Sequence, residues 1–172
     1  MNKRIKKKHR KQENKKLCER YPFLIPYHRW YGKCMWESKD NWYYCSPYSY
    51  TELDAMPKGW RKAFGVQMCE EIREELIKND SLYDYRITQI KEKYGELRWY
   101  DWGTKKGSKV WDIIDKYTEL SRHICLHCGR PAEIIDNCGW LEPVCEGCQS
   151  VQNNNMKQYK MKIERRKKEK NE

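Results

Sequence analysis

Residues 125–148 read CLHCGRPAEIIDNCGWLEPVCEGC, and this stretch governs how the C-terminal part of the chain folds. It holds two Cys-x-x-Cys pairs, Cys125/Cys128 and Cys145/Cys148, with sixteen residues between them. The two-residue gap lets both thiolates of a pair reach one ion from a tight turn, and a spacer of about 15–20 residues is typical of zinc sites. Four thiolates form a closed tetrahedral Zn²⁺ site without an open position. The pattern therefore predicts one structural zinc ion, bound by these four cysteines.

Other potential metal ligands lie close to the four cysteines in the sequence. His123 and His127 flank the first pair, and either could replace a cysteine, because zinc also binds imidazole nitrogen. Cys138 lies inside the spacer, where we expect it to take no part in the site. A redox-active dithiol is a further alternative, but it needs one pair and not two pairs of matching spacing. The four-cysteine zinc site is therefore the favoured interpretation.

The segment after Cys148 predicts a long helix, because it contains no Pro or Gly from Gln149 to Lys170. A cysteine turn, a short hairpin in the spacer and a helix that carries the last two ligands describe a treble-clef-like finger. The helix would begin at the second cysteine pair and end in a basic tail.

Residues 56–79 carry the clearest helical pattern, with Pro57 in the first turn and a stop signal at Asn79. Its apolar stripe recurs every four positions and consists of Trp60, Phe64, Met68, Ile72 and Leu76. We expect this stripe to face a core, because the opposite side is acidic. A second helix is predicted over 108–121, with Ser108 as its cap. Its apolar face consists of Val110, Ile113, Ile114, Tyr117 and Leu120.

Residues 85–102 predict a β-hairpin that turns at residues 94–95. Its return strand alternates between an inner face with Leu97 and Trp99 and an outer face with Arg98, Tyr100 and Trp102. Ile87 and Ile90 are three positions apart, so we expect a bulge to bring both to one face. Together the elements predict an α+β fold: a β-hairpin with two packed helices, followed by a treble-clef-like four-cysteine zinc finger and a basic C-terminal helix.

Charge is concentrated at the ends of the chain. The 172 residues carry 36 Lys and Arg against 25 Asp and Glu, a formal net charge of +11. Residues 1–16 carry +8 and residues 157–172 carry +5, which leaves −2 for residues 17–156. We therefore expect four parts: a basic arm over 1–17 that is disordered alone or helical only when bound, an aromatic-rich α+β domain over 18–122, the zinc finger over 123–150 and a basic helix or tail over 151–172.

Basic arms of this kind favour contact with the phosphate backbone of nucleic acid. The candidate contacts lie in the two arms and in the short loop before the second helix. They are Lys6, Lys7, Lys8, Arg10, Lys11, Lys105, Lys106, Arg165, Arg166, Lys167 and Lys168. Solubilising tails, and a plain lead-in to the helix for the loop, are the alternatives. If the charge acts in binding, removal of 1–16 and 157–172 should weaken salt-dependent binding and leave the fold intact.

Residues 21–50 hold eleven aromatic side chains in thirty positions. Three prolines break any long helix there, so we predict an irregular segment. We expect the rings to pack on the core with their polar tips in water. A stacking platform for unpaired bases is the alternative.

The composition excludes several classes of protein. No apolar run reaches about 18 residues, which predicts no membrane span. The basic start lacks an apolar segment, so we expect no secretory signal and a cytoplasmic location. Nine cysteines without an export signal favour reduced thiols or a metal site over disulfides. Cys18, Cys34, Cys45 and His28 leave a second metal site open, although their spacing matches no ligand pattern.

Treble-clef fingers with two cysteine pairs also frame HNH-type endonucleases, which require histidine in the spacer. The spacer of residues 129–144 contains none, so the general base is absent. No nucleophile elbow, phosphate loop or zincin helix is present. We therefore expect no enzymatic activity. The alternatives are a metal-dependent nuclease or its remnant, using Glu133 or Asp136 with Mg²⁺, and a structural protein of the virion.

Residues 89–100 (QIKEKYGELRWY), the helix after them, Cys-x-x-Cys-Gly, Gly139-Trp140 and the closing cysteine pair resemble small zinc-finger proteins encoded by bacteriophages and prophages. Residues 21–26 (YPFLIP) and 59–65 (GWRKAFG) are similar to gut-phage proteins of this kind. The resemblance implies a phage accessory protein in the bacterial host cytoplasm. It also implies an anti-CRISPR-like inhibitor of host defence, whose partner is nucleic acid or a Cas-type ribonucleoprotein. Many of these phage proteins lack such long basic tails.

Overall fold

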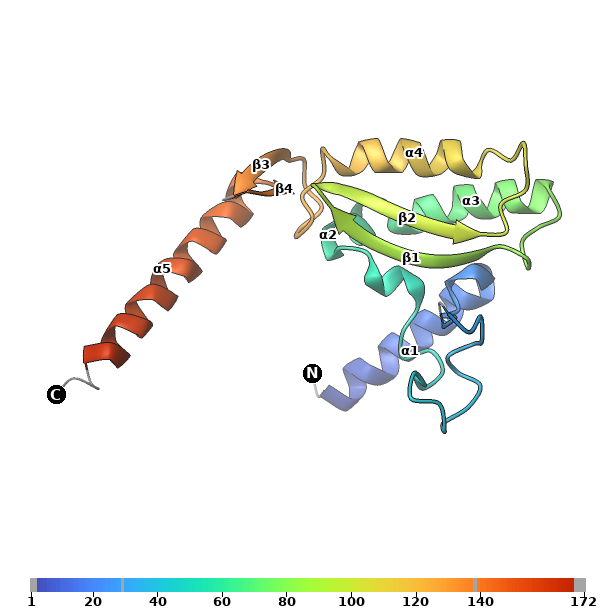
Figure 1. Cartoon of the computed structure of the whole chain (residues 1–172), viewed down its shortest axis with the longest axis horizontal. Helices are drawn as coiled ribbons and strands as arrows, with labels where there is room; N and C mark the ends of the chain where they lie inside the picture. The colour runs from blue at the N-terminus through green and yellow to red at the C-terminus, as the bar shows by residue number, and fades with distance from the viewer. Residues whose placement is uncertain (1–2, 29, 138, 169–172) are drawn as a thin grey trace.

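A computed structural model describes residues 3–28, 30–137 and 139–168 of the chain. Figure 1 shows a body in which the strands β1 and β2 lie between the helices α3 and α4 on one side and α1 on the other. The small hairpin of β3 and β4 follows at one end of this body, and α5 extends away from it. The mixed helix and strand content, with a cysteine cluster near the C-terminus, confirms the predicted α+β class.

The central hairpin consists of β1 (Arg86–Lys93) and β2 (Glu96–Trp102), paired antiparallel. Its register shifts between Ile87 and Gln89, which confirms the predicted bulge. Because of this shift, Ile87 and Ile90 are both buried, together with Leu97 and Trp99 from β2. The hairpin therefore presents one apolar face to the core.

The predicted helix over 56–79 forms as α2 (Lys58–Trp60), the π-helical turn η3 (Arg61–Gly65) and α3 (Val66–Lys78). All five residues of the predicted apolar stripe are buried in the core. The second predicted helix is α4 (Val110–Ser121), which buries three of its five predicted apolar residues: Val110, Ile114 and Tyr117. The Ser121 hydroxyl accepts a 2.8 Å hydrogen bond from the Leu97 amide, so α4 is fixed to β2.

Instead of the disordered arm expected over 1–17, the structure has the helix α1 (Lys3–Arg20). The C-terminal half of α1 is docked: Asn14 is fully buried and donates a 3.0 Å hydrogen bond to the Tyr48 carbonyl. Arg20 donates two hydrogen bonds of 2.7 Å to the Glu70 carboxylate on α3. Charge density alone predicted disorder, whereas these tertiary contacts stabilise the helix. A cut after residue 16 would remove the buried Asn14, so the structure does not support the expectation that the arm is dispensable for the fold.

Asp54, in the short helix η2 (Glu52–Ala55), joins α1 to the body. Its side chain is 5% exposed and lies 3.1 Å from the Arg10 guanidinium. It accepts hydrogen bonds from the Thr51 amide, at 2.8 Å, and from the Arg61 guanidinium. Burial acts to raise the pKa of Asp54, but the Thr51 and Arg61 hydrogen bonds outweigh it and hold the pKa below its ordinary value of 3.8.

Replacing Asp54 by Asn is expected to lower the free energy of unfolding at pH 7 by about 2–3 kcal/mol, because Arg61 loses its charged partner in a buried setting. The folded-state pKa is lower than the unfolded one, so this stabilisation is complete above the ordinary value and is lost as pH falls through the folded-state value. The difference between wild type and Asp54→Asn, measured by urea denaturation, should therefore shrink in acid. The exposed Asp40→Asn is the matched control, and equal stability of both variants at pH 7 would contradict this role.

The segment over 21–50 is irregular, as predicted, and contains the short helix η1 (Pro22–Leu24). Tyr21 and Phe23 are buried in the core, in line with the expected packing role. Trp30 and Trp42 are instead 83% and 82% exposed, so part of this segment presents rings to solvent.

The C-terminal part contains β3 (Glu133–Asn137), β4 (Trp140–Val144) and α5 (Glu146–Lys168). The two strands form an antiparallel hairpin, as predicted for the spacer. The helix α5 is continuous across the domain boundary expected at residue 150 and begins inside the second cysteine pair. In the described part of the chain, no helix has the length and apolar character needed to cross a membrane.

Candidate metal centre

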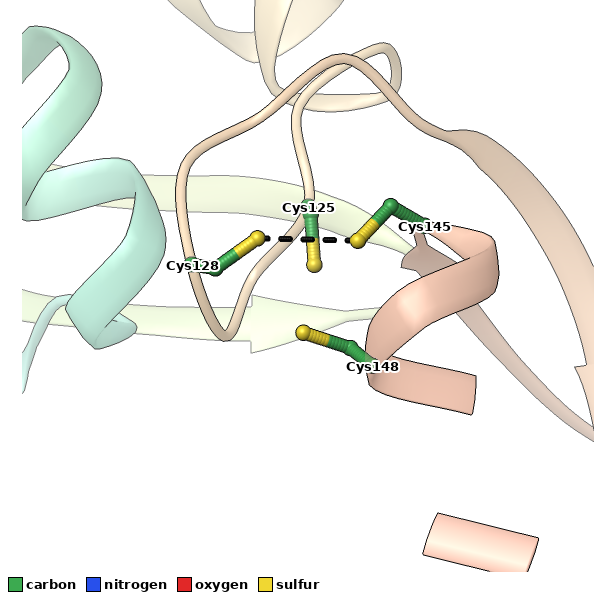
Figure 2. A group of neighbouring side chains, drawn as sticks. All are labelled: Cys125, Cys128, Cys145 and Cys148. Carbon is green, nitrogen blue, oxygen red and sulfur yellow. Dashed lines mark hydrogen bonds between the residues drawn. The ribbon is translucent and has the colours of Figure 1, made fainter. Parts of the chain in front are cut away.

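The four cysteines of the two pairs meet at one point. The Sγ atoms of Cys125, Cys128, Cys145 and Cys148 all lie within 4.8 Å of one another. Figure 2 shows the sulfur atoms turned toward a common centre. The Sγ atoms of Cys128 and Cys145 are 3.6 Å apart. Cys125 is buried and the other three are half-buried. The predicted ligand set is thus confirmed as a spatial cluster whose four sulfur atoms are close enough to hold one metal ion.

Backbone hydrogen bonds shape the turn that carries the first pair. The Gly129 amide donates to the Cys125 carbonyl at 2.9 Å, and the Cys125 amide donates to the Arg130 carbonyl at 2.8 Å. Gly129 has a φ of +79°, a conformation that favours glycine. The turn thereby directs both thiols of the Cys-x-x-Cys pair to the same side.

The second pair lies at the start of α5, where the Cys148 amide donates a 2.9 Å hydrogen bond to the Cys145 carbonyl. The strand β4 brings this pair to the first one, because the Leu126 amide donates a 3.0 Å hydrogen bond to the Pro143 carbonyl. The β3–β4 hairpin thus brings the second cysteine pair back to the turn that carries the first pair.

Arg130 supplies positive charge beside the sulfur atoms. Its guanidinium lies 3.6 Å from the Cys145 Sγ. The Arg130 side chain is the main cause that lowers the pKa of Cys128 to about 6, and the Cys148 backbone amide lowers the pKa of Cys145. Both shifts act toward the thiolate, the form that binds metal ions, whereas burial raises the pKa of Cys148 to about 12.

Replacing Arg130 by Ala is expected to weaken Zn²⁺ affinity by about 10–100-fold, the usual effect of removing a group that supports metal ligands. The physical reason is the loss of the cation that stabilises thiolate charge. Competition with a chromophoric chelator measures the affinity, with Arg130→Lys as the variant that keeps the charge and Arg73→Ala on α3 as the control. An unchanged affinity in Arg130→Ala would contradict this role.

The finger is fastened to the body through the first turn of α2. The Gly59 amide donates a 2.8 Å hydrogen bond to the Leu126 carbonyl, and the Trp60 indole donates a 2.7 Å hydrogen bond to the Ile124 carbonyl. A Cβ atom on Gly59 would lie 2.1 Å from the Cys125 carbonyl oxygen. The two backbones therefore approach so closely that only glycine fits.

The two histidines considered as alternative ligands have other contacts. The His123 Nε2 lies 3.6 Å from the Glu119 carboxylate, and the His127 Nε2 is 2.8 Å from the Gln152 amide nitrogen on α5. Among the described residues, the structure does not bring Cys18, Cys34, Cys45 and His28 together as a second group of potential ligands. His28 instead stacks on Tyr31, with ring centroids 4.7 Å apart. Cys138 lies outside the described residues.

The candidate nucleic-acid contacts fall into three places. Lys6, Lys7, Lys8 and Arg10 are exposed on α1, where Lys11 is half-buried and donates a 2.6 Å hydrogen bond to the Ser46 hydroxyl. Lys105 donates hydrogen bonds to the carbonyls of residues 79 and 80 after α3, so this side chain caps a helix, while Lys106 is exposed.

The third place is the distal part of α5. Arg166 is exposed there, and the side chains of Arg165, Lys167 and Lys168 lie outside the described set. The structure thus does not bring the three groups of candidates together into one patch.

The acidic residues considered for a nuclease lie on β3. Glu133 and Asp136 are exposed, and the Asp136 carboxylate accepts a 2.6 Å hydrogen bond from the Gly139 amide. The Asp136 side chain therefore closes the turn between β3 and β4.

Sequence reasoning missed Gly59, Trp60 and Arg130 as residues that support the site. Trp60 belongs to the predicted core stripe, and its indole N–H bond to the finger carries no separate sequence signal. The available signal for Arg130 is its position directly after the Cys-x-x-Cys-Gly turn.

Comparison of the chain with known proteins found no matching family model, no similar curated protein and no similar solved structure. The resemblance to phage-encoded zinc-finger proteins therefore stays a prediction.

Proposed function

We propose that this chain is a non-enzymatic, zinc-stabilised protein that binds nucleic acid or a nucleoprotein complex. The observation that carries the proposal is the fixed basic surface of α1. Lys6, Lys7, Arg10 and Lys11 line a pocket of about 340 Å³ together with Ser49. The docked C-terminal half of α1 holds this surface against the body, so the charges are arranged before a partner binds. Such preorganisation reduces the entropy lost on binding.

The metal centre supports a structural role for zinc. Four thiolates are the donor set of closed zinc sites, which leave no position for a substrate or a reacting water. Four thiolates and Zn²⁺ sum to a charge of −2, and the adjacent Arg130 offsets part of it. The site would therefore shape the C-terminal part and would not itself attract a polyanion.

The surface charges support phosphate recognition. Basic side chains lie exposed on the N-terminal half of α1. The acidic side chains of α3 are largely neutralised or buried, because Glu70 pairs with Arg20, Glu71 pairs with Lys116 and Glu75 is buried. A polyanion would thus be attracted to the exposed half of α1, which gives both affinity and orientation.

The resemblance to phage proteins extends the proposal to a host-defence target. A nucleoprotein such as a Cas-type effector offers both phosphate charge and a protein surface, which suits a body with shape and a basic helix with charge. Co-purification of the tagged chain with a Cas nuclease and its guide RNA tests this extension. Absence of any effector from the purified material would restrict the proposal to nucleic acid.

Replacing Lys6, Lys7 and Lys8 together by Ala is expected to weaken binding to nucleic acid and to reduce the slope of log K against log salt by about 2–3. Each lysine that contacts a phosphate releases counterions, so its loss lowers the salt dependence. Fluorescence anisotropy over a salt series measures both effects. The control changes three other exposed lysines, Lys33, Lys39 and Lys62, to Ala.

The proposal fails if the wild-type chain, loaded with zinc, binds no nucleic acid at low salt. It also fails if both triple variants lose the same affinity, because α1 then has no special role. Incubation of the same protein with plasmid and Mg²⁺ should retard the DNA in a gel without cutting it. Cleavage would contradict the non-enzymatic part.

A further inference from the structure

The outer face of the β1–β2 hairpin is a second surface with a defined composition. The register pairs Arg86 with Trp102, Gln89 with Tyr100, Lys91 with Arg98 and Lys93 with Glu96. Because Ile87, Ile90, Leu97 and Trp99 point into the core, these four pairs alternate to the opposite side, where all members except the buried Glu96 are at least partly exposed. Figure 1 shows the hairpin in front of α3, which belongs to the core side.

Two aromatic rings stand on this face. Tyr100 is 44% exposed and Trp102 is 68% exposed. Aromatic side chains of this size stabilise a fold mainly when they are buried, so these two rings leave much apolar surface in contact with water. The two residues are two positions apart on one strand, which separates them by about 6.8 Å. That separation is about twice the 3.4 Å rise per nucleotide of one strand, so the rings have room to stack on separate bases.

Basic side chains lie against two rings in this region. The Lys91 ammonium lies 5.4 Å from the centroid of the Tyr100 ring, and the Arg86 guanidinium lies 4.0 Å from that of Tyr27. Glu96 is the single acid among these four pairs; it is buried and forms ion pairs with Arg98 and with Arg122. The face as a whole is therefore positively charged.

A pocket of about 450 Å³ lies beside β1. Gln89, which stands on the outer face of the hairpin, also lines this pocket, together with Tyr27, Trp30 and Tyr50. A chain that crosses the hairpin would thus find further rings beside Tyr100 and Trp102, and an amide that can hydrogen-bond to base edges.

We propose that the outer face of the β1–β2 hairpin is a stacking platform for single-stranded nucleic acid, an inference that rests on the proposed function and names its substrate class. Exposed rings on an open sheet stack on unpaired bases, and lysines beside them neutralise phosphates. A duplex hides the faces of its bases, so the rings discriminate in favour of a single strand. The charge complementarity favours nucleic acid over an apolar protein segment as the occupant.

The test compares Trp102→Ala and Tyr100→Ala in the zinc-loaded full chain. The probes are oligothymidylate, oligouridylate and a DNA duplex of the same length. Each variant is expected to lose about 10-fold in affinity for both single strands, the usual effect of removing one stacking ring, and to keep its affinity for the duplex. The two single-stranded probes distinguish DNA from RNA as the preferred form.

Trp111→Ala is the matched control, because Trp111 is 60% exposed on α4 and lies outside this face. Trp102→Phe keeps a ring and should restore binding. Circular dichroism and zinc content show that each variant is folded.

The platform is overturned if Trp102→Ala and Tyr100→Ala leave single-strand affinity unchanged, or if they weaken single-strand and duplex binding equally. In either case binding to the duplex by the wild type would leave the proposed function standing. A wild-type chain that binds none of the three probes would refute both.

Discussion

Replacing Cys125 by Ser is expected to abolish zinc binding and to unfold the C-terminal part of the chain, from the cysteine turn through the first turns of α5. Cys125 is the fully buried member of the four-cysteine site, and its loss leaves three ligands. Metal binding in such fingers supplies about 10–16 kcal/mol of apparent free energy at neutral pH, far more than the small hairpin of β3 and β4 gains from packing. Elemental analysis should find one zinc per wild-type chain and none in the variant.

Circular dichroism should report the loss of helix from α5, and a strong chelator should produce the same change in the wild type. Cys45→Ser is the control, because Cys45 is half-buried and takes no part in the site. It should keep both the zinc and the helix signal. A wild-type chain that unfolds cooperatively at the same urea concentration with and without chelator would contradict a structural role for the metal.

Replacing Gly59 by Ala is expected to destabilise the protein by about 3 kcal/mol or more, the upper range for forcing an extra group into a packed site. The added Cβ would lie 2.1 Å from the Cys125 carbonyl oxygen and 2.7 Å from the Gly129 amide nitrogen. Both are backbone atoms that hydrogen bonds hold in place, so they cannot move aside as a flexible side chain can. The body and the finger must then separate. Urea denaturation should show lower stability and lower cooperativity.

Gly65→Ala is the matched control within the same helical segment. Its Cβ would meet the Met56 Sδ at 3.2 Å and a Leu53 methyl at 3.4 Å, both on side chains that can adjust. Ala is favoured over Gly in a helix by about 1 kcal/mol, so this variant should be near wild type in stability. Zinc content distinguishes the effects of the two substitutions, because Gly59→Ala should keep one zinc per chain whereas Cys125→Ser should lose it. Equal stability of Gly59→Ala and Gly65→Ala would refute the close backbone contact.

Local sequence patterns predicted several parts of the fold correctly. The stripe of Trp60, Phe64, Met68, Ile72 and Leu76 predicted the buried face of the helical segment, because residues four apart share a helix face. The spacing of Ile87 and Ile90 predicted the bulge in β1, because strict alternation failed there. Both signals lie within one element and need no knowledge of its partners.

The helix α1 shows where local patterns were insufficient. Its charge predicted a disordered arm, and nothing near Asn14 in the sequence indicates that this side chain is buried against Tyr48, 34 residues away. The ion pair of Arg10 with Asp54 spans a similar distance along the chain. Long-range contacts of this kind depend on how the chain folds back, which charge and composition do not encode.

The cluster of four cysteines could be predicted from the order of the residues, because two Cys-x-x-Cys pairs at this spacing bring four thiols together through one local turn and one short hairpin. The attachment of that finger to the body could not, since it depends on the contact of Gly59 with the cysteine turn and on the bond from Trp60 to Ile124. The fixed position of the basic residues on α1 could not be predicted either. It depends on the docked C-terminal half of the helix, which holds the charged N-terminal half in place. Ligand spacing is a property of nearby residues, whereas close approach between distant backbones depends on the packing of the whole core.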